Sequence, residues 1–242
     1  MSAAAGEPPG RAWRDVGSAL LAYLAMPVFG LLALSVLLGG FPADDAAELP
    51  MGPALAAQCA ASLLVLFLAF RLGRPGPLGR GLVAAPLLYV AFLLVFVPVA
   101  LILLPWVWQR LGLPLAPQDH LVWFLGERPL GYWVVGLLTV TLVGPIYEEV
   151  VFRGFLLRGL RSMLGDLGAV ALSGFLFGLM HAGSGWFLVL PLTLLGGFLG
   201  WLRLRFEGLL APCLVHVLHN TLVIVLTLTV PELVGAVYGE GG

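Results

Sequence analysis

Residues 131–154 read GYWVVGLLTVTLVGPIYEEVVFRG, and this stretch decides the class of fold. It begins with an apolar run that, at about 20 residues, is long enough to cross a bilayer. It ends with three ionisable side chains, Glu148, Glu149 and Arg153. Ionisable groups within a membrane-spanning helix usually face the protein interior or a wet cavity, because contact with lipid is costly for them. The stretch therefore predicts a transmembrane helix with a functional polar end.

The whole chain has the composition of an integral membrane protein. Of its 242 residues 60% are hydrophobic and only 10% are charged, and the mean hydropathy is +1.04. A formal net charge of -1 gives no reason to expect a nucleic-acid partner. The two cysteines, Cys59 and Cys213, lie in apolar runs, where we expect them to act as small hydrophobic residues rather than as a disulfide.

Hydropathy predicts an all-α fold, a polytopic transmembrane helix bundle with about seven to eight spans. The predicted spans are 17–39, 53–71, 82–106, 131–152, 165–183, 186–203 and 208–230. Segment 107–130 is interrupted by proline and polar residues, so it either lies along the membrane interface or forms the eighth span. By motif content we divide the chain into N-terminal helices (1–130), a helical core (131–230) and a short tail (231–242).

Arginine placement predicts the orientation of the bundle. With a cytoplasmic N-terminus, all basic residues except Arg110 and Arg128 fall on the cytoplasmic side, as the positive-inside rule requires. The loop 41–52 contains acidic but no basic residues, which suits the outer face. We therefore expect an integral protein of a bacterial cell membrane whose N-terminus is cytoplasmic.

Helical spacing predicts how the charged residues of the first motif are arranged. Glu149 and Arg153 are four residues apart with the acid first, the favourable order for an ion pair on one helix face. Glu148 is rotated by about 100° from Glu149, so the two neighbouring carboxylates point in different directions. We expect Glu148 to face a cavity while Arg153 holds Glu149.

Depth in the membrane predicts that three helices contribute to one site. Glu148 and His181 lie about equally far from a turn expected near Gly165, so antiparallel helices would place them level. His216 reaches the same depth on the last predicted span, and Asn220 lies one turn deeper. Small residues four apart, at 174 and 178 and at 196 and 200, would let the helices of this region approach closely.

These residue types indicate hydrolysis by an activated water molecule. A desolvated glutamate can act as a general base near neutral pH, and a neighbouring imidazole can orient the water. A second histidine and an asparagine amide can donate hydrogen bonds to a developing oxyanion. The set Glu148, His181 and His216 would also suit a catalytic divalent metal such as zinc, although no His-Glu-x-x-His motif is present. Metal-free and metal-assisted activation both stay open.

The polar motifs together resemble the CPBP (Abi) family of intramembrane proteases. That family includes the CAAX prenyl endopeptidases of eukaryotes and bacterial proteins linked to bacteriocin processing or self-immunity. The resemblance covers residues 131–225. It rests on three motifs in order: Glu-Glu-x-x-x-Arg at 148–153, Phe-x-x-x-His at 177–181 and His-x-x-x-Asn at 216–220.

The resemblance implies a role for each motif residue. Glu148 and His181 would activate the attacking water, His216 and Asn220 would form the oxyanion site, and Glu149 with Arg153 would support them. The substrate would be a membrane-embedded or lipid-tethered peptide, cleaved near the cytoplasmic leaflet by an endopeptidase often named a metalloprotease. His219 falls outside the motifs, and we expect it to pack or to bond locally.

Three other functions use the same residues. A buried polar network can fix helix register without any chemistry. Carboxylates and imidazoles can also relay protons in a transporter, although the chain lacks the paired discontinuous spans typical of that class. A non-catalytic immunity or scaffold protein would use the fold only to bind a membrane partner. Substrate cleavage by the purified protein and proton-coupled flux in vesicles distinguish these functions.

Overall fold

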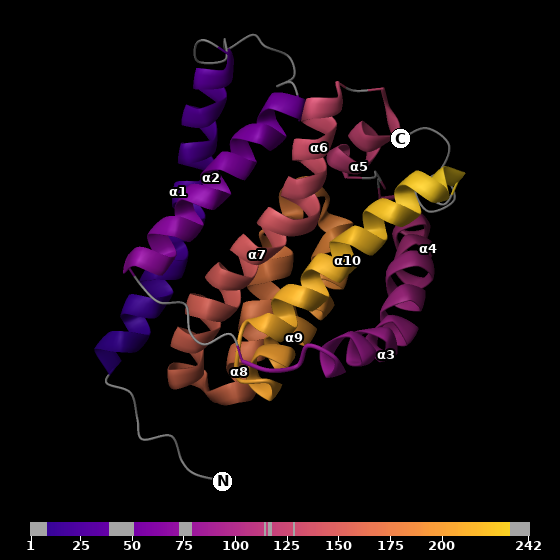
Figure 1. Ribbon diagram of the computed structural model, residues 1–242. Helices are drawn as coiled ribbons and strands as arrows, with labels where there is room; N and C mark the ends of the chain where they lie inside the picture. Colours follow the sequence, from indigo (N-terminus) through magenta and orange to yellow (C-terminus); the bar gives the residue numbers. More distant parts are fainter. Residues whose placement is uncertain are drawn as a thin grey trace. The chain divides into compact units, whose positions relative to one another are not determined.

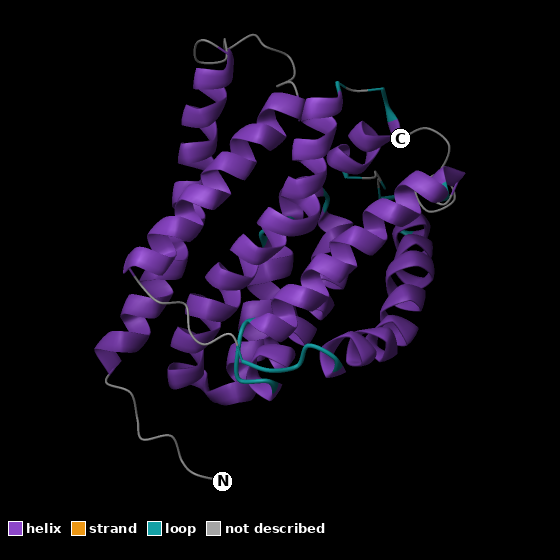
Figure 2. Cartoon of the chain, in the orientation of Figure 1, coloured by secondary structure: helices purple, strands orange, loops and turns teal. Residues whose placement is uncertain are grey.

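The computed structural model describes residues 9–38, 51–72, 79–113, 115, 118–127 and 129–232. Within these ranges the chain is helical and contains no strand (Figure 2). The all-α fold class is therefore confirmed. Most of the predicted acidic loop at 41–52 and of the predicted tail at 231–242 lies outside the described residues.

The α-helices follow one another along the chain (Figure 1). They are α1 (Pro9–Leu38), α2 (Met51–Leu72), α3 (Ala84–Pro98), α4 (Leu104–Arg110), α5 (Asp119–Leu125), α6 (Leu130–Leu138), α7 (Gly144–Glu149), α8 (Leu157–Leu179), α9 (Val189–Arg205) and α10 (Leu210–Thr229). Three π-helical segments, η1 (Val99–Leu103), η2 (Thr139–Val143) and η3 (Val150–Leu156), join helices without a break. Two short 3₁₀ segments, η4 (Ala182–Ser184) and η5 (Trp186–Leu188), precede α9.

Four helical stretches of the described chain are long and apolar enough to cross a membrane. They are Ala84–Arg110, Leu130–Ser184, Trp186–Arg205 and Leu210–Thr229, and Met51–Phe67 is a shorter apolar helix. The 55-residue stretch is interrupted at Gly165, whose φ of 71° is left-handed, so the turn expected there is confirmed. With seven residues, α5 is too short to span, so the described part of 107–130 provides no eighth span.

The chain forms two compact units, which we describe separately. Unit 1 comprises residues 1–76 and 128–169 and contains α1, α2, α6, α7 and the start of α8. Unit 2 comprises residues 77–127 and 170–242 and contains the rest of α8 with α3, α4, α5, α9 and α10. The first polar motif therefore belongs to unit 1, and the two histidine motifs belong to unit 2.

Two of the π-helical segments have a local cause in the sequence. Proline lacks an N–H donor, and its ring clashes with the carbonyl group four residues earlier. A widened turn before the proline relieves this clash, and η1 precedes Pro105 just as η2 precedes Pro145. The third segment, η3, contains no proline but holds Arg153, and π-helical turns occur frequently at functional sites.

Glycine contacts hold α8 and α9 together in unit 2. A Cβ atom on Gly174 would lie 2.6 Å from the backbone nitrogen of Gly197, and one on Gly178 would collide with Thr193. A Cβ atom on Gly196 would lie 3.0 Å from the Cα atom of Gly174. The predicted close approach is therefore present at these glycines, whereas Gly200 has only ordinary contacts with a valine.

Candidate active site

Glu149 and Arg153 form a buried ion pair in unit 1. A guanidinium nitrogen of Arg153 donates to the Glu149 carboxylate at 2.8 Å, and both side chains have 0% exposure. Glu149 is the last residue of α7 and Arg153 lies one turn later in η3. The predicted pair is thus confirmed, and every residue of η3 is buried around it.

Glu148 has a different environment from its neighbour. Its side chain is half-buried, whereas that of Glu149 is inaccessible. Its carboxylate acts electrostatically on the hydroxyl groups of Tyr23 and Tyr147. The different surroundings of the two acids agree with the rotation expected between adjacent helical positions. That Glu148 faces a catalytic cavity stays a prediction.

His181 is oriented by a bond to the backbone of its own helix. Its Nδ1 atom lies 2.7 Å from the carbonyl oxygen of Phe177. A carbonyl oxygen can only accept, so Nδ1 must carry the proton. In the neutral ring this leaves the lone pair on Nε2, where it can accept a proton or bind a metal ion. The half-buried ring is thus held in the form that general-base chemistry needs.

Phe177 brings the two motif histidines together in unit 2. Its ring centroid lies 4.9 Å from that of His181 and 5.5 Å from that of His216, and its side chain is buried. His216 comes from α10, so this aromatic contact joins two helices that each carry one imidazole. Asn220 lies one turn beyond His216 on the same face of α10.

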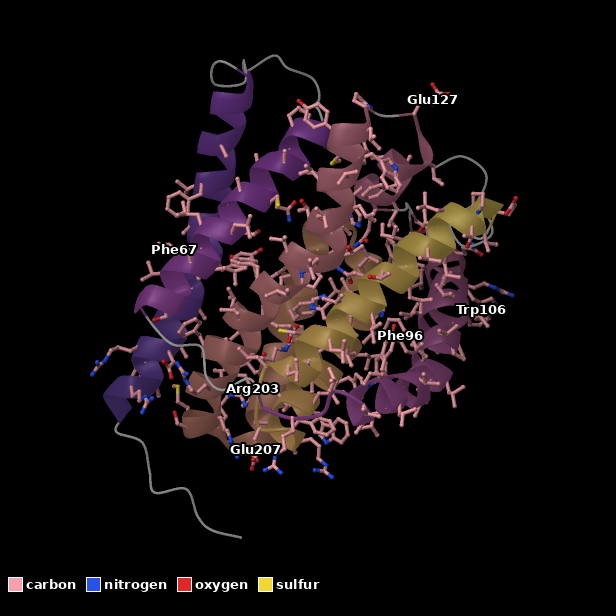
Figure 3. All side chains as sticks on the ribbon, in the orientation of Figure 1. Phe67, Phe96, Trp106, Glu127, Arg203 and Glu207 are labelled. Carbon is pink, nitrogen blue, oxygen red and sulfur yellow. The ribbon has the colours of Figure 1, made fainter. Side chains whose placement is uncertain are left out.

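His219 packs and bonds within unit 2, although its partner is 130 residues away in the sequence. Its Nδ1 atom lies 3.0 Å from the hydroxyl oxygen of Tyr89, and the edges of the Tyr89 and Phe96 rings pack against it. Figure 3 labels Phe96 on α3. Tyr89 is not among the residues that the motifs indicate, although a tyrosine within an apolar span signals a hydroxyl group that needs a partner.

The donor set for a metal ion is divided between the two units. His181 and His216 belong to unit 2, while Glu148, the third candidate ligand, belongs to unit 1. Among the residues that the structure describes, no three histidine, cysteine or acidic side chains gather into a group that could hold a metal ion. We therefore derive no step through a metal.

Each of the two units carries residues suited to part of a hydrolytic reaction. Unit 1 supplies a half-buried carboxylate beside a rigid ion pair, and unit 2 supplies two imidazoles and an amide. A carboxylate and an imidazole can activate water, while an imidazole and an amide can stabilise an oxyanion. That the two groups of residues form one site stays a prediction from the sequence.

Comparison with known proteins agrees with the motifs. A family model described as Type II CAAX prenyl endopeptidase Rce1-like matches residues 130–222, which is under half of the chain but contains all three motifs. A search of curated proteins and a search of solved structures each gave no match. Residues 130–222 are therefore similar to the CAAX prenyl endopeptidase family, in agreement with the resemblance that the three motifs carry.

Proposed function

We propose that the protein is an intramembrane endopeptidase that cleaves a membrane-embedded or lipid-tethered peptide near the cytoplasmic leaflet. The family match supports protease activity in general terms. The observation that carries the specific proposal is the state of His181, whose proton is held on Nδ1 by the Phe177 carbonyl group and whose Nε2 is left as an acceptor.

Hydrolysis would begin with the removal of a proton from water. Glu148 takes this proton while His181 Nε2 accepts the second hydrogen of the same water and directs it. The water oxygen attacks the peptide carbonyl carbon, and the π electrons of the C=O bond move to the carbonyl oxygen. His216 and Asn220 donate hydrogen bonds to that oxyanion. The C–N bond then breaks, and Glu148 returns its proton to the leaving amine.

Glu149 and Arg153 would act indirectly in this scheme. A buried ion pair fixes the local backbone, because any rotation that separates the charges leaves both without compensation in a dry interior. The 2.8 Å bond spans the junction of α7 and η3, directly beside Glu148. The pair therefore helps to hold the direction of the catalytic carboxylate.

The test compares peptide termini in membranes from cells that express wild type or Glu148→Gln at equal abundance. Glu127→Gln is the matched control, because Glu127 is an exposed glutamate outside the motifs. A terminus present with wild type and the control but absent with Glu148→Gln would support proteolysis and identify the substrate. Identical profiles would contradict the proposal and favour an immunity, scaffold or transport function.

The purified protein and the substrate found in this way separate the two modes of water activation. Cleavage that continues in the presence of a strong chelator supports glutamate-activated water. Cleavage that the chelator stops and zinc restores would assign Glu148, His181 and His216 to a metal instead.

A further inference from the structure

The first helix, α1, lies outside the family match. Within unit 1 it packs on η3, the segment that holds Arg153 of the first polar motif. Its buried positions Ala12, Asp15 and Ala19 follow helical spacing and form one face. Two of the three are alanines, which let the helix axes approach. Asp15 is a charged residue in this face and is only 7% exposed, so it needs a partner there.

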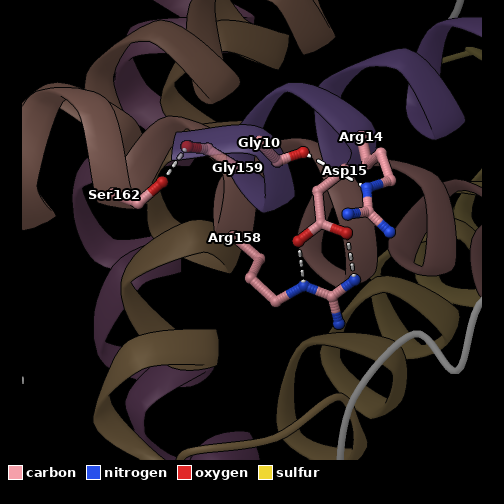
Figure 4. A network of polar contacts seen from close by, with 6 residues as sticks. All are labelled: Gly10, Arg14, Asp15, Arg158, Gly159 and Ser162. Atoms are coloured by element: carbon pink, nitrogen blue, oxygen red, sulfur yellow. Dashed lines mark hydrogen bonds and ion pairs between the residues drawn. The ribbon is translucent and has the colours of Figure 1, made fainter. Parts of the chain in front are cut away.

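Arg158 of α8 is the partner of Asp15. Its Nε and a terminal nitrogen donate to the two carboxylate oxygens at 2.6 and 2.7 Å (Figure 4). Such a bidentate pair fixes the angle as well as the distance between two side chains. Next to it, a Cβ atom on Gly159 would lie 2.8 Å from the Ala12 carbonyl oxygen. The α1 and α8 backbones therefore approach closely at this point.

A second polar contact joins α1 to α7. The hydroxyl group of buried Tyr147 donates to the carbonyl oxygen of Ala22 at 3.0 Å. The next residues along the two helices are Tyr23 and Glu148, and the Glu148 carboxylate acts electrostatically on the Tyr23 hydroxyl group. Tyr23 of α1 is therefore within electrostatic range of the proposed catalytic base.

The two contacts lie on either side of the buried ion pair. Along the chain, Tyr147 precedes Glu149 and Arg153, and Arg158 follows them. Along α1, Asp15 and Ala22 are seven residues apart, or about 10 Å. Helix α1 packs on η3, whose residues are all buried. Thus α1 covers the segment that holds the pair.

We propose that α1 is a positioning element of the proposed active site, in which the Asp15–Arg158 and Tyr147–Ala22 contacts hold it against η3 so that Glu149 and Arg153 stay sealed and Glu148 keeps its direction. The effect on cleavage rests on the proposed function. The proposed mechanism assigns Asp15 and Arg158 no chemical step, so their effect would pass through η3. The inference extends the active site beyond the region that the family match covers.

The experiment combines steady-state kinetics with hydrogen exchange of the full-length purified protein. Asp15→Asn is expected to raise amide exchange in peptides covering 147–156 and to lower kcat by tenfold to about a hundredfold with little change in KM. The double change Asp15→Arg with Arg158→Asp restores the ion pair with its charges exchanged. It should bring both the amide exchange of 147–156 and kcat most of the way back to wild type. Tyr147→Phe, which removes only the second contact, should change exchange in the same direction.

The matched control is Asp166→Asn. It breaks an exposed Arg161–Asp166 pair of the same chemistry, 2.6 Å long, in the same unit. Exposed ion pairs contribute little to stability, so neither amide exchange at 147–156 nor kcat should change. Unchanged exchange at 147–156 in both Asp15→Asn and Tyr147→Phe, or a failure of the reversed pair to recover either readout, would overturn the inference.

The exchange measurement also separates this inference from the proposed function. If wild type cleaves nothing, the proposed function fails, while localised exchange in Asp15→Asn still establishes that α1 holds η3. If wild type cleaves and Asp15→Asn keeps full kcat, the proposed function stands and the positioning role is wrong. Should Asp15→Asn not accumulate, Tyr147→Phe and the reversed pair provide the same comparison.

Discussion

Two neighbouring glutamates in this protein have opposite environments. Glu149 is sealed with Arg153 at 2.8 Å, whereas Glu148 is half-buried. Both follow from helical geometry, because a step of one residue turns a side chain by about 100°. Glu149, the paired acid, and Glu148, the proposed catalytic acid, are neighbours in the chain but their side chains point in different directions.

Breaking the Glu149–Arg153 pair should destabilise the protein. Removing one partner of a buried pair leaves the other charge uncompensated, which typically costs about 3–5 kcal/mol. We expect Glu149→Gln or Arg153→Met alone to lower the free energy of unfolding in detergent by about this amount. The double variant should be more stable than either single one, and additive losses would show that the two side chains are not coupled.

Replacing His181 should affect catalysis and leave stability unchanged. The amide of asparagine occupies the position of Nδ1 and can keep the bond to the Phe177 carbonyl oxygen, but it has no group at the position of Nε2. His181→Asn is therefore expected to lower kcat by about 10²–10⁴, the range for loss of a general acid or base. Rates of cleavage and thermal unfolding curves check this. A fully active His181→Asn would remove His181 from the mechanism.

At the scale of elements, α10 presents its motif residues at fixed angles. His219 lies about 60° from His216 and about 100° from Asn220 around the helix. Its bond to Tyr89 of α3 and the ring edges beside it fix the imidazole. A directional bond restricts rotation of a helix about its axis more than apolar contacts do. The Tyr89–His219 bond therefore helps to fix the directions of the His216 and Asn220 side chains.

Loss of the Tyr89 hydroxyl group should therefore lower both the free energy of unfolding and the kcat of the proposed cleavage. Tyr89→Phe leaves a buried imidazole without this partner, at a cost of about 1–3 kcal/mol. His219→Asn, which can keep a polar atom at the position of Nδ1, should be milder than His219→Gln, which cannot. Unfolding free energies and kcat for the variants check this order. Equal effects of Asn and Gln would show that the bond to Tyr89 is unimportant.

For the whole molecule, the distribution of arginines predicts which ends of the helices face the cytoplasm. Figure 3 labels Arg203, in the last turn of α9, and Glu207, which follows that helix. Arg80 forms an exposed 3.8 Å pair with Glu207, so this end of unit 2 is polar. The positive-inside rule assigns it to the cytoplasm, as it does the N-terminus of α1.

Cysteine labelling tests this orientation in intact cells. After replacement of the two native cysteines, Ser162→Cys should resist a membrane-impermeant thiol reagent until the cells are opened. Leu111→Cys, also exposed, should react from outside, because the sequence assigns the end of α4 to the opposite side. The reverse labelling pattern would invert the topology and move the proposed cleavage away from the cytoplasmic leaflet.

The sequence by itself determined whatever depends on local periodicity and composition. Apolar runs of bilayer length gave the membrane helices, a glycine gave the break at Gly165, and a spacing of four gave the Glu149–Arg153 pair. The three motifs also sufficed to predict the similarity to CAAX prenyl endopeptidases that the family model finds over residues 130–222. The exact helix ends and the π-helical segments escaped this reasoning, and two of those segments, η1 and η2, depend on how strain before a proline is relieved.

Tertiary structure alone decided the contacts between residues distant in sequence. Tyr89 and His219 are 130 residues apart, Tyr147 and Ala22 are 125 apart, and Asp15 and Arg158 are 143 apart. Periodicity fixes which side chains share a face of one helix, but it carries no information about which other helix that face meets. The partners are chosen by close packing of whole helices, and this is why the supporting role of α1 became visible only in the folded chain.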